Sequence, residues 1–258
     1  MAPAALITGA SGLLGSWTLH HWDLAGMRPV AVRSSDVDLL RPDAAADLLS
    51  RTSPAAVVHL AWCASGQPDY RTSGDNERWL SASLELAQAC ARSGIPLWLT
   101  GTAVDDTEGQ DAYTRAKAAL RQKLRAEIEG DAVGWLRPFY VFDEKQRRPG
   151  LVAHALRARD ESRPAELQSP DSRHDFVHAS DVGRAIVSAV AHGLTGVVPI
   201  GSGRVRRVAE LVDALGVPWH SGSRSEPAHT HLDVAADISR LRAIGWKPSR
   251  TEEFFGHD

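Results

Sequence analysis

A glycine-rich turn near the start of the chain constrains the fold more than any other feature. The apolar run Ala4-Ala-Leu-Ile-Thr8 leads into Gly9, and Gly12 and Gly15 follow before an amphipathic segment begins. This order is typical of a buried strand that passes directly into a helix. Gly9 can form the tight turn, Gly12 lets a pyrophosphate approach the backbone, and Gly15 lets the helix pack closely on the strand. The sequence therefore predicts a dinucleotide site whose phosphates face the N-terminus of the helix.

Short apolar strands alternate with longer helical segments through the first half of the chain. The run at 54–62 is apolar without polar alternation, as expected for a parallel sheet that is covered on both faces. We therefore predict an α/β fold, a Rossmann-type doubly wound parallel sheet. Strands are expected at 28–33, 54–62, 95–100 and 133–138, and helices at 16–24, 43–49, 77–92 and 111–129.

The composition changes after residue 142, where a charged and turn-rich stretch begins. We expect a dinucleotide-binding domain over 1–142, to which 174–202 returns. A small discontinuous C-terminal substrate lobe is expected from 143–173 and 203–258. Within these segments we predict helices at 151–159, 181–191 and 208–215, with Asp181 as an N-cap, and strands at 174–178 and from 196.

The bulk properties argue against several classes of partner. A formal net charge of -3 creates no field that would attract nucleic acid or an acidic membrane. The chain lacks a signal-peptide pattern and a long apolar run, and its two cysteines are too few for a disulfide framework. We therefore expect a cytoplasmic protein. We also expect no metal site, because His229 and His231 lack suitably spaced partners. His20 and His21 are expected on the surface of the first helix.

A tyrosine and a lysine share one face of a predicted helix. Tyr113 and Lys117 are four residues apart, which places both side chains on the same side. A nearby ammonium lowers the pKa of a phenol, so the phenol can exchange a proton with a substrate oxygen near neutral pH. The lysine can also hold the nicotinamide ribose. Taken alone, such a pair is common by chance and an ordinary helix surface is the better interpretation. The glycine turn and the alternation of strands and helices before it favour the catalytic interpretation.

Two threonines lie where a third catalytic group is expected, at the end of the strand before this helix. Thr102 is our first choice to hydrogen-bond the substrate oxygen and to position it for Tyr113. Thr100 is the competitor and also a cofactor contact, and a simple turn-capping role is the remaining interpretation.

The end of the second strand bears on the choice of cofactor. In a dinucleotide fold an acidic residue there favours NAD, whereas a basic residue favours NADP. Arg33 and Ser34 occupy this place, and an arginine can bind a 2′-phosphate with two hydrogen bonds. A solvated charge at a strand end is the alternative. The sequence favours NADP(H) over NAD(H).

These motifs together resemble the extended short-chain dehydrogenase/reductases, a family of sugar-nucleotide epimerases, dehydratases and ketoreductases. The resemblance covers nearly the whole chain. It is carried by Thr8-Gly-Ala-Ser-Gly-Leu-Leu-Gly15, Val58-His-Leu-Ala-Trp62, Tyr113-x-x-x-Lys117, Leu136-Arg-Pro-Phe-Tyr-Val-Phe142 and Asp175-Phe-Val-His-Ala-Ser-Asp181-Val182.

The resemblance implies further cofactor contacts. The stretch from Val32 to Leu40 is similar to the NADP-leaning reductases of 4-keto-6-deoxysugar nucleotides, which places Asp38 and Leu39 beside the adenine. The expected phosphate, ribose and nicotinamide contacts are Ser11, Leu13, Leu14, Leu60, Ala61, Trp62, Pro138 and Phe139.

Three departures from the family pattern bear on the substrate. The segment 103–112 between Thr102 and Tyr113 is shorter than usual, so the pocket has a different wall. Ala103-Val104 replaces the Asp-Glu pair of dehydratases. Trp79 takes the place of a usual asparagine, with Asn76 nearby. Arg173 and either Arg206 or Arg207 could bind phosphates, although solvated arginines are the simpler interpretation.

We therefore expect an NADPH-dependent ketoreductase for a 4-keto deoxysugar nucleotide or another secondary-metabolite ketone. An NAD-dependent sugar-nucleotide epimerase is the alternative enzyme. A catalytically silent NADP(H)-sensing regulatory protein is the alternative of a different class. A homodimer through the helices near 77–92 and 111–129 is expected from the family.

Overall fold

A six-stranded parallel sheet lies at the centre of the computed structural model, in the order β10-β5-β4-β3-β1-β2. The predicted doubly wound α/β fold is thereby confirmed. The structure describes residues 2–24, 26–64, 69–104, 111–128, 133–145, 150–222 and 233–256. The strands are β1 (Ala4–Thr8), β2 (Arg28–Val32), β3 (Ala56–His59), β4 (Leu97–Thr100), β5 (Val133–Pro138) and β10 (Gly196–Ile200).

The strand order reverses at β1, which pairs with β2 on one side and with β3 on the other. In open sheets of this kind the ligand crevice opens at such a switch point, beyond the carboxyl ends of the strands. The glycine-rich turn follows β1 directly, so the predicted dinucleotide site lies at this crevice.

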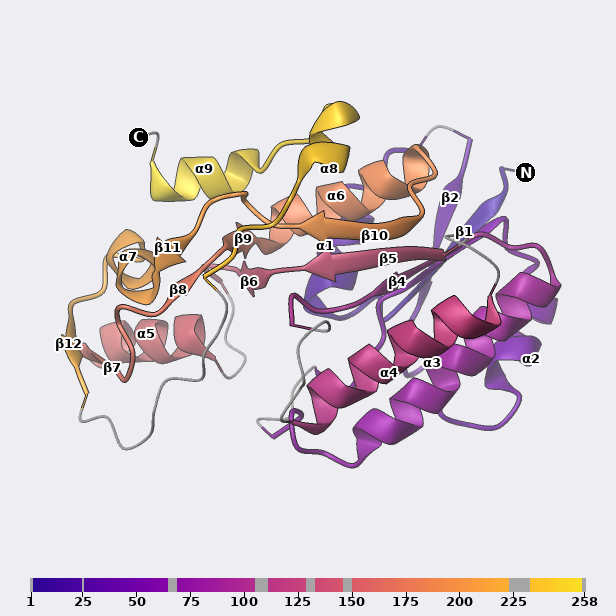
Figure 1. The fold of residues 1–258 in the computed structure, drawn as a ribbon, viewed down its shortest axis with the longest axis horizontal. Helices are drawn as coiled ribbons and strands as arrows, with labels where there is room; N and C mark the ends of the chain where they lie inside the picture. Colours follow the sequence, from indigo (N-terminus) through magenta and orange to yellow (C-terminus); the bar gives the residue numbers. More distant parts are fainter. Residues whose placement is uncertain are drawn as a thin grey trace.

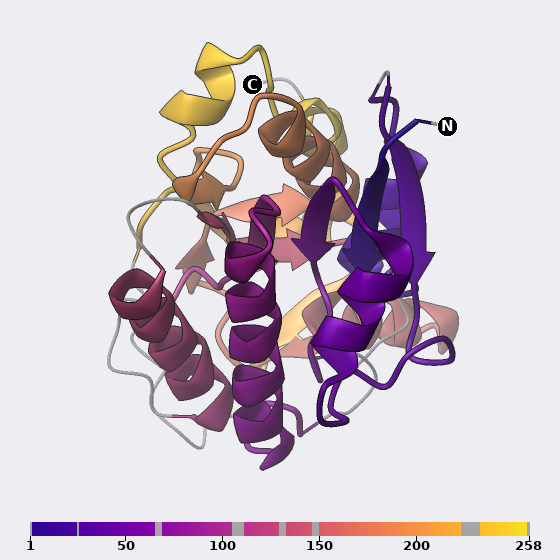
Figure 2. The same cartoon turned by 90° about the vertical axis from the view of Figure 1, so that its right-hand side faces the viewer.

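Helices cover both faces of the sheet, as Figures 1 and 2 show. Successive side chains of a strand point to opposite faces, so Leu6 joins one core while Ala5 and Ile7 join the other. This double burial explains why the strand sequences are apolar throughout. One face carries α2 (Ala44–Thr52), α3 (Asp75–Arg92) and α4 (Ala112–Glu127), and the other carries α1 (Leu13–His20) and α6 (Ala179–Ala191).

The first helix differs from its predicted bounds of 16–24. Helix α1 begins directly after the turn, since Gly12 is extended and accepts the Ser16 N–H at 2.9 Å, and it ends at His20. It crosses α6 closely, because a Cβ on Gly183 would lie 2.6 Å from the Trp17 carbonyl carbon. His21 is half-buried at this crossing and contacts Ser180 Oγ at 2.8 Å, so the surface prediction is wrong for His21.

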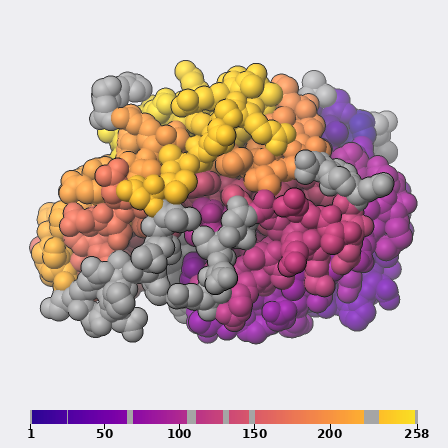
Figure 3. Space-filling model, in the orientation of Figure 1, coloured from indigo at the N-terminus to yellow at the C-terminus, as the bar shows by residue number. Residues whose placement is uncertain are grey.

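A small lobe with its own core is attached at the carboxyl ends of β5 and β10. Phe142, Leu156 and Leu211 are each at most 1% exposed at its centre. Figure 3 shows the lobe at one end of the molecule. Its elements are β6 (Tyr140–Phe142), α5 (Leu151–Asp160), β7 (Ala165–Leu167), β8 (Arg173–His174), β9 (Phe176–His178), β11 (Arg206–Arg207), α7 (Val208–Ala214) and β12 (Trp219–Ser221).

Two short C-terminal helices, α8 (Ser239–Ala243) and α9 (Ser249–Phe255), were not anticipated from the sequence. Leu241 of α8 and Trp246 belong to the same core as Ile7 of the sheet. This part of 203–258 therefore packs on the sheet domain, although we expected the whole segment in the substrate lobe.

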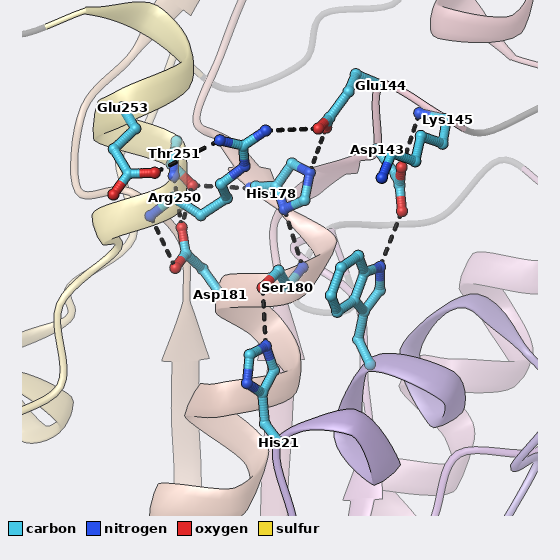
Figure 4. A network of polar contacts seen from close by, with 11 residues as sticks. His21, Asp143, Glu144, Lys145, His178, Ser180, Asp181, Arg250, Thr251 and Glu253 are labelled. Carbon is cyan, nitrogen blue, oxygen red and sulfur yellow. Dashed lines mark hydrogen bonds and ion pairs between the residues drawn. The ribbon is translucent and has the colours of Figure 1, made fainter.

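The predicted N-cap of α6 is wrong. The helix begins at Ala179, and the Nδ1 atom of His178 caps it by accepting the Ser180 N–H at 3.1 Å. Asp181 is instead fully buried within the helix and accepts the N–H and hydroxyl of Thr251 at 2.6 and 2.7 Å. Figure 4 shows this carboxylate pointing to the start of α9. Its role is to attach the C-terminal helix.

None of the helices in the described ranges is long and apolar enough to cross a membrane. Helices α3 and α4, the expected dimer surface, lie side by side on the sheet (Figure 2). The prediction that they mediate a homodimer stays a prediction.

Candidate active site

The turn after β1 requires glycine at two positions for steric reasons. Gly9 has a φ of 68°, and a Cβ there would lie 2.6 Å from the Ala61 nitrogen. A Cβ on Gly15 would lie 2.2 Å from the Gly9 carbonyl oxygen. The chain after β3, at Leu60 and Ala61, thus approaches the turn too closely to admit a side chain. The predicted roles of these glycines in shaping the turn agree with this geometry.

The first turn of α1 has the features of a phosphate site. Gly12 supplies no side-chain cap, so the leading N–H groups of the helix remain for a ligand, at the positive end of the helix dipole. Ser11 is exposed, and Leu13 and Leu14 are partly exposed beside it. This cradle fits the pyrophosphate of a dinucleotide, which carries negative charge.

The residues predicted to meet the adenosine end follow β2. Arg33 and Ser34 are exposed, and the turn is closed by a hydrogen bond from the Arg33 N–H to Asp36 Oδ2 at 2.9 Å. Asp38 is exposed and accepts the Leu40 N–H, and Leu39 packs against the sheet core. The structure therefore brings this group to the same edge of the sheet as the glycine turn, through the β1 and β2 pairing.

His59 at the end of β3 lies buried behind the site. Its Nδ1 contacts Thr8 Oγ1 at 2.7 Å, and its Nε2 contacts Ser83 Oγ at 3.0 Å. Burial, together with the positive charge of Lys117, lowers the pKa of His59 to about 3. The imidazole is therefore neutral in the folded protein at physiological pH and joins β1, β3 and α3.

Because of this pKa, His59 should make the protein sensitive to acid. The unfolded chain binds a proton at this residue below a pKa of about 6.5, whereas the folded chain stays neutral down to about 3. Its contribution to stability is complete above pH 6.5 and falls by roughly 1.4 kcal/mol per pH unit below it. When the pH is lowered from 7 to 5, the free energy of unfolding should fall by about 2 kcal/mol less in His59→Asn than in wild type, as measured by urea unfolding. Equal losses in both proteins would contradict the buried, neutral imidazole.

Lys117 occupies a buried position at the carboxyl end of β4. Its side chain lies on α4, one turn after Tyr113, and the residue is only 3% exposed. The Nζ atom donates to the Thr100 carbonyl oxygen at 2.8 Å and lies 3.6 Å from the centroid of the Trp62 ring. Lys117, Tyr113, Trp62 and Thr100 are therefore brought together as predicted from the sequence, although their catalytic roles stay predictions. Thr102, two residues beyond β4, is half-buried at the same edge.

The start of α4 is fixed by contacts that the sequence did not reveal. Asp111 caps the helix by accepting the Thr114 N–H at 2.8 Å and also pairs with Arg71 at 2.6 Å. Burial alone would raise the pKa of Asp111, but these hydrogen bonds and the arginine charge bring it below its usual value. The Arg71 carbonyl accepts the Tyr113 N–H at 3.0 Å. The loop before α3 thus sets the position of Tyr113.

The nicotinamide end of the predicted site is formed by the last strands. Pro138 ends β5, and the Phe139 N–H donates to the Ile200 carbonyl of β10 at 2.9 Å. The Gly101 N–H donates to the Leu136 carbonyl at 2.6 Å. These bonds align the carboxyl ends of β4, β5 and β10, so that the predicted residues line one continuous edge.

A cluster of possible metal ligands lies between the sheet domain and α9. Ligand atoms of Asp143, Glu144 and His178 are within 4.8 Å of one another. Arg250 donates to Glu144 at 2.6 Å, and His178 Nε2 contacts the same carboxylate at 2.5 Å (Figure 4). The Trp17 indole donates to Asp143. Despite burial, these hydrogen bonds lower the pKa of Glu144 to about 2. The cluster therefore serves as a structural network, and we assign no metal to it. His229 and His231 lie outside the described residues.

The fold and the glycine-turn cradle define a dinucleotide-binding α/β protein. The model of the NAD dependent epimerase/dehydratase family matches residues 5–201, and the chain belongs to this family. The members are NAD(P)-dependent enzymes, so the chain is assigned to this class of oxidoreductases and epimerases and to a nicotinamide dinucleotide cofactor. No curated protein matches the sequence.

Solved structures with the same fold include both reductases and epimerases. dTDP-4-dehydrorhamnose reductase from Bacillus anthracis with NADP aligns with a TM-score of 0.76 at 14% identity, over 99% of this chain and 96% of that chain. UDP-glucose 4-epimerase from Brucella ovis with NAD aligns with a TM-score of 0.77 at 18% identity, over 96% of this chain and 94% of that chain. RMD from Pseudomonas aeruginosa with NADPH aligns with a TM-score of 0.72 at 23% identity, over 96% of this chain and 93% of that chain. At these identities the likeness shows the fold.

Proposed function

We propose that the protein is an NADPH-dependent ketoreductase with Tyr113 as proton donor. The observation that carries the proposal is the buried ammonium of Lys117, held at the carboxyl end of β4 one helical turn from Tyr113. A positive charge beside a phenol favours the phenolate, which is the effect that a tyrosine needs to exchange a proton near neutral pH. Thr102 would orient the substrate oxygen toward the phenol. The nicotinamide supplies the hydride when bound.

The choice of NADP(H) rests on Arg33. Its place after β2, beside the β1 switch point, is where an adenosine 2′-phosphate would be recognised. Arg33→Ala should raise the Kd of NADPH about tenfold or more through loss of a charge-assisted bond, and change the Kd of NADH less than about twofold. The matched control is Arg28→Ala, at the opposite end of the same strand. Equal affinity of the wild type for both cofactors would contradict the assignment.

The substrate is proposed as a ketone, with a 4-keto deoxysugar nucleotide as the first class to test. The arginines expected to bind its phosphates already have other partners. Arg173 pairs with Asp233 at 3.1 Å, and Arg207 pairs with Glu210 at 3.1 Å. Arg206 lies 4.3 Å from the centroid of the Phe255 ring. These contacts favour testing uncharged secondary-metabolite ketones with equal weight.

A screen for NADPH oxidation tests the proposal. Purified protein is incubated with NADPH and each of two panels, 4-keto sugar nucleotides and polycyclic ketones, and the absorbance of the reduced cofactor is followed. We expect turnover with a member of one panel. An NAD-dependent epimerase would instead retain NAD on purification and interconvert a sugar nucleotide without net cofactor consumption. A silent NADP(H) sensor would bind the cofactor and turn over neither panel.

The two cysteines bear on the cellular location that we propose. Cys63 and Cys90 are free thiols. Reduced cysteines are the usual state in the cytoplasm, which we propose as the location.

A further inference from the structure

Trp62 has a position that the proposed reaction does not by itself explain. It follows β3 and is 8% exposed, with its ring facing the ammonium of Lys117 at 3.6 Å. An ammonium over an indole face is attracted by the negative face of the ring quadrupole, most strongly where water is excluded. Its ring also meets the Tyr113 ring edge-on, with centroids 6.4 Å apart. The indole therefore touches both members of the predicted catalytic pair.

The orientation of this indole is fixed from behind by Asn76. The Trp62 Nε1–H donates to Asn76 Oδ1 at 2.9 Å. Asn76 is fully buried, and its amide donates to the carbonyls of Tyr70 and Ser73 at 2.7 and 2.9 Å. Both ends of the Asn76 side chain are therefore bonded, and the ring plane of Trp62 is determined by the loop that leads into α3.

Among the contacts of the ammonium in this pocket are two groups of different chemistry. The Thr100 carbonyl accepts one of its protons, and the Trp62 ring covers another side. Burial disfavours a charged amine, so a lysine that is 3% exposed needs such partners to remain protonated. A charged ammonium at this point is what the proton donor role of Tyr113 requires.

We propose that Trp62 is a positioning residue that holds the Lys117 ammonium, charged, beside Tyr113 through its indole face, with Asn76 as its anchor. The inference rests on the proposed ketoreductase function. Trp62 acts through Lys117 and takes no part in bond making. Asn76 therefore supports Lys117 indirectly, through Trp62 at the end of β3.

The contact is tested without reference to activity by NMR of the full chain with lysine labelled at Cε. The protein has four lysines, so Lys117→Arg identifies the signal by its loss. We expect the Lys117 ε-protons to be shifted upfield by the indole ring current. Trp62→Leu should abolish this shift and Trp62→Phe should keep part of it. Trp79→Leu, which removes the neighbouring indole 6.3 Å from Trp62, is the matched control and should retain it. An unchanged shift in Trp62→Leu would overturn the inference.

Kinetics then separate a positioning role from simple packing. Trp62→Leu should lower kcat about tenfold, and Trp62→Phe less. Reduction needs the protonated phenol, and a displaced ammonium raises the phenol pKa. The decline of kcat on the basic side should therefore move to higher pH in Trp62→Leu. An unaltered kcat and pH profile, with the NMR shift abolished, would also overturn the role. If the wild type reduces no ketone, the proposed function fails, while the NMR result still decides where Lys117 is held.

Discussion

Replacing Tyr113 with phenylalanine should lower kcat for ketone reduction by about 10²- to 10⁴-fold, the usual contribution of a positioned general acid. The phenyl ring keeps the edge contacts with Trp62 and Tyr70, at centroid distances of 6.4 and 5.2 Å, and only the hydroxyl is lost. The Kd of NADPH should therefore change less than about threefold. Steady-state kinetics on the ketone found in the screen, with cofactor titration, measure both.

Tyr70→Phe is the matched control, because Tyr70 lies against the Tyr113 ring but is not placed in the proton transfer. It should keep kcat within about threefold of wild type, as expected for a surface-loop change. Wild-type turnover in Tyr113→Phe would show that another group donates the proton. An equal loss in both variants would show that ring packing, and not the phenol, is required.

Gly15→Ala should weaken the binding of NADPH by about 100-fold, the size of effect expected when a binding group is displaced by about 1 Å. Its Cβ would lie 2.2 Å from the Gly9 carbonyl oxygen and 2.8 Å from the Ala10 Cα, so α1 must move away from the turn. Because the obstructing atoms belong to the backbone, no rotamer change can relieve the contact. The free energy of unfolding should also fall by about 1–3 kcal/mol. Isothermal titration with NADPH and urea unfolding measure the two effects.

Gly74→Ala provides the control for this substitution. Gly74 precedes α3 with a φ of -64°, and a Cβ there would meet nothing within 4 Å. This variant should bind NADPH like the wild type and unfold at the same or a slightly higher urea concentration. Unchanged NADPH affinity in Gly15→Ala would contradict a phosphate site at the N-terminus of α1.

The sheet could be predicted from the sequence because its strands are buried on both faces. Runs such as 54–62 are apolar throughout, and glycine spacing after β1 leaves few alternatives to a strand and helix turn. The same argument identified the edge where Lys117 and Thr100 meet, since the carboxyl ends of parallel strands share one side. The strand ends differ from the prediction: β3 covers only Ala56–His59, and Leu60 and Ala61 beyond it approach Gly9.

Contacts between distant polar residues could not be predicted. Arg71 lies before α3 and Asn76 lies in its first turn, and their partners Asp111 and Trp62 are set by tertiary packing. Asp181 has the residue type and the place of an N-cap. Its buried carboxylate instead accepts the Thr251 N–H, a contact between residues far apart in the sequence. The signal available for Asn76 was its closeness to the position where the family has an asparagine.

The most direct test of the ketoreductase account follows a labelled hydride. NADPH carrying deuterium at C4 of the nicotinamide is mixed with the protein and the ketone identified in the screen, and the alcohol is examined by mass spectrometry and NMR. The account predicts one deuterium at the carbinol carbon for each NADPH oxidised, with label transferred from one face of the nicotinamide only. An alcohol without deuterium, or an epimerised product formed while NADPH is not consumed, would contradict it.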